Sequence, residues 1–98
     1  MKYKLIFLPQ ARNDAEEVRK YLSQYYSGTV EKFFALLKKR INSLRINPYI
    51  YEQYHERSSY RKLVANDYLV FYKVNDDQKR VEIHRILHGS REIERYLK

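Results

Sequence analysis

The chain has 98 residues, of which 44% are hydrophobic and 33% charged, a composition typical of a soluble globular protein. A chain of this length buries one modest core, so we expect residues 1–98 to form one domain, without a large cofactor-binding fold or a repeat array. Twenty Lys and Arg against twelve Asp and Glu give a net charge of +8. This charge predicts an anionic partner such as nucleic acid, anionic lipid or acidic protein; the alternative is that it serves solubility alone.

Cysteine is absent, which excludes disulfides and thiolate metal sites. His55, His84 and His88 lack the spacing of a zinc motif, so we expect neither a metal nor a cofactor. The apolar runs are far shorter than the ~20 residues that a membrane span needs, and the N-terminal one is too short for a signal peptide. The sequence therefore predicts a cytoplasmic protein that does not contact the membrane.

The first half of the chain predicts a strand followed by two helices. Residues 3–8 have strand character, and Pro9 stops the strand. Apolar residues at three- and four-residue steps predict amphipathic helices over 12–26 and 30–46, joined as an antiparallel hairpin. The first helix is expected to bury Ala15, Val18, Leu22 and Tyr25. Near its end the second helix carries Lys38, Lys39, Arg40 and Arg45, which either complement the helix dipole or bind a ligand.

The second half predicts a sheet. A tyrosine-rich loop over 48–59 is followed by strand patterns at 60–64, 68–74 and 80–87, separated by turn signals. Ser90 is expected to cap a short helix over 91–97. The order β-α-α-β-β-β-α predicts an α+β fold: an antiparallel sheet of about four strands, a helix hairpin on one face and a short C-terminal helix.

The last strand pattern and the residues after it contain polar candidates. Alternation places Arg85 with Val81, Ile83 and Leu87 on one face, and His84 with Glu82, Ile86 and His88 on the other. His84 is either functional or a hydrogen-bonded sheet histidine, and His88 is either functional or a loop histidine bonded to the backbone. Arg91 lies in the first turn of the predicted helix, where a guanidinium can clamp a phosphate or carboxylate.

Basic and aromatic side chains alternate where the loop joins the first of these strands. Arg57, Arg61 and Lys62 interleave with Tyr54 and Tyr60. This alternation is typical of single-stranded nucleic-acid binding, because cations contact the backbone and rings stack on bases. The same tyrosines could instead cover the open edge of the sheet.

The C-terminal half resembles that of RelE/ParE toxins. Residues 68–74, a short acidic turn and residues 81–92 match its strands, and the most specific piece is Leu87-His88-Gly89-Ser90-Arg91-Glu92. The N-terminal strand, the charged helix hairpin, the size and the basic charge also match. The resemblance implies the toxin of a bacterial type II toxin–antitoxin module, a class linked to plasmid stabilization and growth inhibition. Its partner is then a cognate antitoxin whose C-terminal segment wraps the toxin, and an acidic segment suits a charge of +8.

Two activities occur in this superfamily, and the resemblance favours the ParE type, which poisons DNA gyrase. The alternative is a RelE-type, metal-independent endoribonuclease that cuts mRNA on the ribosome. Leu69 stands where those enzymes usually have an arginine, and one lost transition-state contact costs about 3–4 kcal/mol. Under this alternative the catalytic candidates are Arg91, Arg61, Lys62, His88 and Tyr96, although Tyr96 is about one residue out of register. Candidates for contact with the target or with RNA are Arg57, Tyr60, Arg85 and Tyr54.

Overall fold

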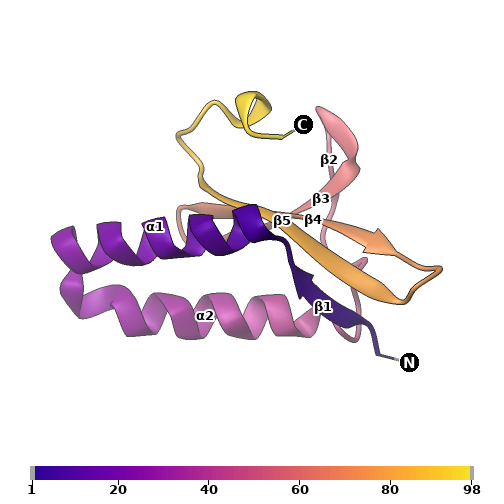
Figure 1. Ribbon diagram of the computed structural model, residues 1–98, viewed down its shortest axis with the longest axis horizontal. Coiled ribbons are helices and arrows are strands. Elements are labelled where there is room, and N and C mark those ends of the chain that lie inside the picture. The colour runs from indigo at the N-terminus through magenta and orange to yellow at the C-terminus, as the bar shows by residue number, and fades with distance from the viewer. Residues whose placement is uncertain (1, 98) are drawn as a thin grey trace.

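The computed structural model describes residues 2–97, and a helix hairpin lies against a sheet in it (Figure 1). Within these residues no helix is both long and apolar enough to cross a membrane. The elements in chain order are β1 (Lys4–Phe7), α1 (Pro9–Tyr25), the 3-10 turn η1 (Ser27–Thr29), α2 (Val30–Ser43), β2 (Gln53–Tyr54), β3 (Arg57–Ala65), β4 (Tyr68–Asn75), β5 (Arg80–His88) and the 3-10 turn η2 (Ile93–Arg95).

The five strands form one sheet in the order β1-β5-β4-β3-β2. β1 pairs with β5 in parallel and all other neighbours are antiparallel. The predicted α+β class is confirmed, but the sheet is mixed and has one strand more than expected. The extra strand, β2, lies in the predicted loop, and its two residues are too few to show a strand period.

Both helix boundaries differ from the predicted ones for local reasons. α1 begins at Pro9 and not at Arg12, because proline needs no N–H partner in a first turn and its fixed φ suits that position. α2 ends at Ser43, three residues early, where the Leu44 N–H bonds to the Ile41 carbonyl and tightens the turn. The buried face of α1 also differs from the prediction. Tyr25 is 61% exposed, and the buried residues of this helix are Ala11, Asp14, Val18 and Leu22.

Two apolar clusters lie on opposite faces of the sheet. The larger one joins both helices to the sheet, with Phe33 and Leu37 of α2 packed over residues such as Leu63 and Val70. The smaller one lies beneath the C-terminal segment 91–97 and consists of Tyr60, Phe71, Leu87 and Leu97. Val70 and Phe71 of β4 are fully buried on opposite faces, as the continuous apolar pattern of this strand predicts.

A β-bulge in β5 overturns the predicted alternation of that strand. Phe71 pairs with Arg85 but Tyr72 pairs with Ile83, which leaves His84 as an extra residue. An extra residue shifts every later side chain to the other face. Ile86 therefore joins Ile83 in the larger cluster, whereas the prediction placed the two on opposite faces.

The C-terminal helix predicted over 91–97 is shorter than expected. Only Ile93–Arg95 form a short 3-10 turn, and Glu92, not Ser90, precedes it. The Ser90 hydroxyl lies 2.8 Å from Nδ1 of His88 and caps no helix. The segment crosses the second face of the sheet, where Leu97 is fully buried (Figure 1).

Because Leu97 anchors this segment, we expect Leu97→Ala to lower the free energy of unfolding by about 2–4 kcal/mol and to speed amide exchange over residues 91–97. The matched control is Ile46→Ala, an exposed aliphatic residue whose loss should change stability by less than about 0.5 kcal/mol. Chemical denaturation and hydrogen exchange measure both effects. Equal stabilities for the two variants would contradict the anchoring role.

Candidate functional site

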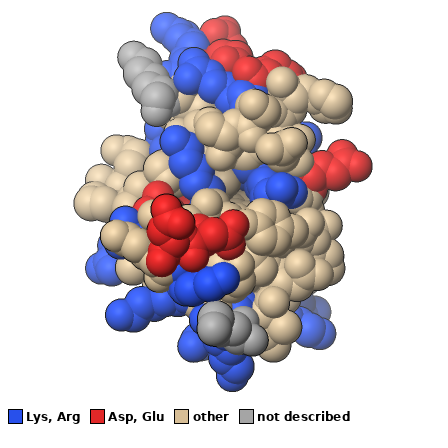
Figure 2. Space-filling model, turned by 90° about the vertical axis from the view of Figure 1, so that its right-hand side faces the viewer, with Lys and Arg blue, Asp and Glu red and all other residues tan. Residues whose placement is uncertain are grey.

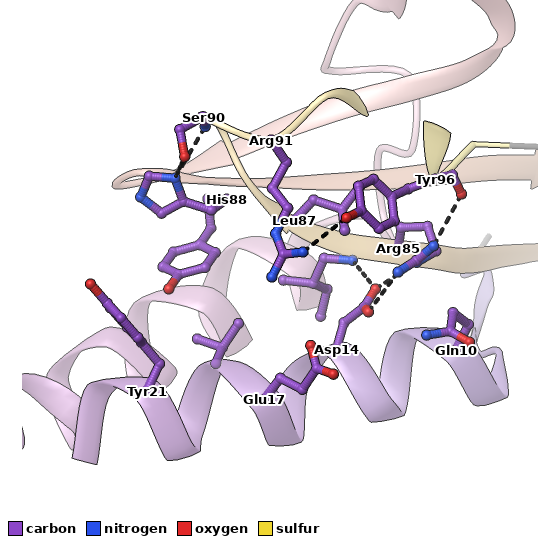
Figure 3. Close-up of a pocket in the computed structure, with 13 residues that line it drawn as sticks. Gln10, Asp14, Glu17, Tyr21, Arg85, Leu87, His88, Ser90, Arg91 and Tyr96 are labelled. Atoms are coloured by element: carbon purple, nitrogen blue, oxygen red, sulfur yellow. Dashed lines mark hydrogen bonds and ion pairs between the residues drawn. The ribbon is translucent and has the colours of Figure 1, made fainter. Parts of the chain in front are cut away.

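A cleft of about 440 Å³ separates α1 from the end of β5 and the C-terminal segment (Figure 3). α1 contributes Asp14, Glu17 and Tyr21 to its walls, and the opposite wall includes His88 and Arg91. The cleft therefore brings together acidic, basic and aromatic groups from segments that are far apart in the sequence.

A buried ion pair lies in one wall of the cleft. Asp14 is 4% exposed and accepts hydrogen bonds from Nε and Nη2 of Arg85, at 2.7 and 2.9 Å. The same carboxylate accepts the backbone N–H of Ile86 at 2.9 Å. The hydrogen bonds from Arg85 to Asp14 raise the pKa of Arg85, so its charge is fixed. Arg85 is thus committed to an internal partner, although it was predicted to contact the target.

Tyr96 connects both arginines of the cleft to the C-terminal segment (Figure 3). The guanidinium carbons of Arg85 and Arg91 lie 5.2 and 5.4 Å from the centroid of its ring. Arg91 donates to the Tyr96 hydroxyl at 3.0 Å, and Arg85 donates to the Tyr96 carbonyl at 3.1 Å. Cation–π contacts and hydrogen bonds therefore hold this segment against β5.

His88 lies at the end of β5 and is held by the turn that follows. Its Nδ1 accepts the backbone N–H of Ser90 at 3.1 Å, and its ring packs edge-on against Tyr68 at 5.2 Å. Because Nδ1 accepts a hydrogen bond, the proton of the neutral ring is on Nε2. This is the backbone-bonded arrangement of a loop histidine. His88, Arg91 and Tyr96 line the same cleft.

Arg61 and Lys62 lie on opposite faces of β3 and not in this cleft. Arg61 pairs with Tyr72, which belongs to the larger cluster, and it donates to the Tyr51 carbonyl at 2.7 Å. Lys62 pairs with Phe71 of the smaller cluster, and its Nζ lies 5.7 Å from the ring of Tyr54. The predicted catalytic candidates therefore occupy three separate places.

The sheet face beside the smaller cluster carries a second group of polar residues. Nε2 of His84 lies 3.4 Å from Glu82, and Arg80 forms an ion pair with Glu82 at 2.8 Å. Burial lowers the pKa of His84, and its bond to Glu82 opposes this only in part. Burial also acts to raise the pKa of Glu82, but the hydrogen bonds from Arg80 and His84 outweigh it and lower that pKa. Lys73 lies over the ring of Tyr60 at 4.6 Å.

The remaining contact candidates take part in internal packing. Tyr60 is buried, with its ring 5.3 Å from that of His84. Tyr54 packs edge-on against Phe71 at 5.1 Å, and Arg57 pairs with Glu94 at 3.2 Å. These tyrosines cover the sheet, which is the structural alternative that the sequence left open.

Sequence reasoning missed Asp14, Lys73 and Glu82. A signal for Asp14 was present, because it falls on the same helical face as Ala11, Val18 and Leu22, and a carboxylate on a buried face needs a partner. Lys73 and Glu82 are cross-strand partners in β4 and β5. Their pairing depends on the position of the bulge, which no residue pattern indicates.

Residues 5–93 match the family model of the ParE toxin of type II toxin-antitoxin system, parDE. The chain belongs to this toxin family. The resemblance to the RelE/ParE superfamily that the sequence predicted is therefore confirmed. No curated protein matches the sequence of this ParE-family toxin.

Solved structures of low sequence identity share the fold of this ParE-family toxin. The chromosomal ParDE system from P. aeruginosa has a TM-score of 0.75 at 15% identity, over 89% of this chain and 96% of that one. A mutant of the E. coli toxin RelE in the free state has a TM-score of 0.65 at 20% identity, over 99% of this chain and 100% of that one. The toxin–antitoxin complex RelBE2 from Mycobacterium tuberculosis has a TM-score of 0.64 at 18% identity, over 90% of this chain and 99% of that one.

Asp14→Ala should lower the free energy of unfolding by about 3–5 kcal/mol, because it leaves Arg85 and the Ile86 N–H without their partner. Glu17→Ala is the matched control on the same helix and should change stability by less than about 0.5 kcal/mol. In denaturant unfolding, the double variant Asp14→Ala/Arg85→Ala should cost less than the two single changes together. Additive costs would contradict the pairing.

Stability should also depend on pH through His84. Its pKa is lower in the folded protein than the ordinary 6.5, so the unfolded chain binds the proton more readily. The free energy of unfolding should therefore fall as the pH drops below 6.5, and His84→Gln should flatten the curve. His55→Gln, in an exposed turn, is the matched histidine-to-glutamine control. Urea unfolding between about pH 5.5 and 7.5 measures this, and identical curves for wild type and His84→Gln would contradict it.

Proposed function

We propose that this ParE-family toxin acts without catalysis in the cytoplasm by inhibiting DNA gyrase, and that a cognate antitoxin neutralises it. The observation that carries the proposal is the dispersal of the residues that a nuclease would need. Arg91, His88 and Tyr96 share one cleft, whereas Arg61 and Lys62 lie on opposite faces of β3. Cleavage of a phosphodiester requires several cations aimed at one phosphate, and this arrangement does not supply them.

The hairpin tip is the surface that we propose for contact with the target. Tyr21, Tyr25 and Tyr26 are 47%, 61% and 55% exposed, and the ring of Tyr21 lies 5.0 Å from that of Tyr25 and 6.2 Å from that of Tyr26. Tyrosine is enriched among the residues that dominate the binding energy of protein interfaces. These three exposed rings are suited to insertion into a partner surface. The hairpin end that carries them projects beyond the sheet (Figure 1).

Two lines of support exist for an antitoxin partner. Two of the similar structures come from toxin–antitoxin systems, ParDE from P. aeruginosa and RelBE2 from Mycobacterium tuberculosis. The net charge of +8 favours an acidic binding segment. On the face shown in Figure 2, Lys and Arg are spread between separate groups of Asp and Glu, so positive charge is available on that side.

The second candidate function is a ribosome-dependent endoribonuclease. The observation that favours it is the cleft itself, where Arg91 could contact a phosphate and His88 or Tyr96 could transfer a proton. Arg91→Ala would then abolish cleavage of mRNA. Under the gyrase proposal this variant cuts no mRNA because the wild type cuts none.

The test compares purified toxin in two assays, gyrase supercoiling and primer extension on translated mRNA. We expect the toxin to block supercoiling or to accumulate gyrase-cleaved DNA, and to leave mRNA intact. Tyr25→Ala/Tyr26→Ala should weaken inhibition by at least about 10-fold, because truncating central interface residues commonly costs more than 1 kcal/mol.

The control for this variant is Ile46→Ala/Ile50→Ala, which removes two exposed apolar side chains beyond the opposite end of α2. It should inhibit gyrase as the wild type does. Cuts in mRNA together with unaffected supercoiling would replace the gyrase proposal with the endoribonuclease. Unaffected gyrase and intact mRNA, with folded protein shown by circular dichroism, would refute both.

A further inference from the structure

The basic charge of the chain is concentrated in one stretch. Residues 32–51 contain five Lys or Arg and no Asp or Glu, so this stretch supplies +5 of the net +8. Most of it is α2 and the turn that follows. The cations are Lys32, Lys38, Lys39, Arg40 and Arg45.

The outer face of α2 carries these charges into solvent. Phe33, Leu37 and Ile41 are buried, and at 3.6 residues per turn Lys32 and Lys39 lie opposite them. Seven residues separate these two lysines, which places them about 10 Å apart along the helix axis. Lys38 flanks this line on one side. In Figure 1, α2 forms the lower edge of the molecule.

Structural roles account for only part of this charge. Arg40 donates to the Val64 carbonyl at 2.6 Å and so covers the edge of β3. The helix dipole favours cations in the last turn, but Lys32 is in the first turn, where it disfavours them. Within residues 2–97, Lys32, Lys38 and Lys39 form no ion pair, and Glu31 is paired with Arg19 of α1.

The chemistry of this face distinguishes among anionic partners. A membrane-binding helix needs an apolar face to insert, but the apolar face of α2 is already in the core. The bases of a single strand stack on aromatic rings, and the centres of protein interfaces are enriched in Trp and Tyr, whereas this helix face presents Lys32, Ala35, Lys39 and Asn42. The phosphate backbone of a double helix needs only cations, because counterion release supplies the affinity.

We propose that the outer face of α2, built on Lys32, Lys38 and Lys39, binds the phosphate backbone of a nucleic-acid duplex without reading its sequence. Duplex DNA carries one negative charge per about 1.7 Å of its axis, so several phosphates lie within the span of the three lysines. The proposal uses none of the exposed tyrosines at the hairpin tip. It therefore does not depend on gyrase being the target.

The experiment measures fluorescence anisotropy with labelled duplexes of about 20 base pairs, one of DNA and one of RNA, long enough to span the helix face. If the protein contacts three phosphates, raising the salt concentration from about 50 to 200 mM should weaken binding about 40-fold. Lys32→Gln/Lys38→Gln/Lys39→Gln should bind weakly and lose about 3 from the slope of log K against log salt. Binding of either duplex supports the proposal, and the comparison identifies which one is preferred.

The control is Arg12→Gln/Lys20→Gln/Arg95→Gln, which also lowers the net charge from +8 to +5 but leaves α2 intact. It should keep most of the wild-type affinity and salt slope. Equal losses in the two variants would show that total charge and not this face carries the binding, and would overturn the proposal. So would failure to bind either duplex at about 50 mM salt, or binding to phosphatidylserine vesicles in place of duplexes.

Discussion

β1 ends at Phe7, opposite Ile83, so the later residues of β5 have no strand beside them on this edge. The carboxylate of Asp14 lies there instead. It accepts the Ile86 N–H, which would otherwise lack a strand partner at this edge of the sheet. The same carboxylate fixes Arg85, and Arg85 holds the C-terminal segment through Tyr96. One buried group therefore fixes the helix hairpin, the edge of the sheet and the C-terminal segment relative to one another.

The bulge at His84 makes this arrangement possible. Without the extra residue, Ile86 would leave the helix-covered core, and Arg85 would share a face with Ile83. With it, Ile86 packs in the core while its N–H meets Asp14, and Leu87 packs beneath the C-terminal segment. The cleft beside Arg91 is therefore a consequence of backbone register as much as of side-chain chemistry.

The sequence was informative wherever an element is long enough to show its period. Both helices and the strands around 68–74 and 80–87 could be predicted for this reason, whereas β2, with two residues, could not. The bulge has no glycine or proline to mark it, so alternation failed after Ile83. In the site, the place of Arg91 beside the end of β5 was predictable from the motif. Ser90 does not cap a helix as predicted, because its hydroxyl lies against Nδ1 of His88.

The cations divide into those that have partners within the protein and those that do not. On the sheet, Glu82 neutralises Arg80, and Arg57 is paired with Glu94 beside the C-terminal segment. Such pairs leave little field for a distant partner, because the opposite charges cancel within a few ångströms. Among residues 2–97, the lysines on the outer face of α2 form no ion pair, and the aromatic rings at the hairpin tip are exposed. A hairpin fixed at its base by Asp14 can present both surfaces with little loss of backbone conformational entropy on binding, so it is the part of the molecule best suited to contact partners.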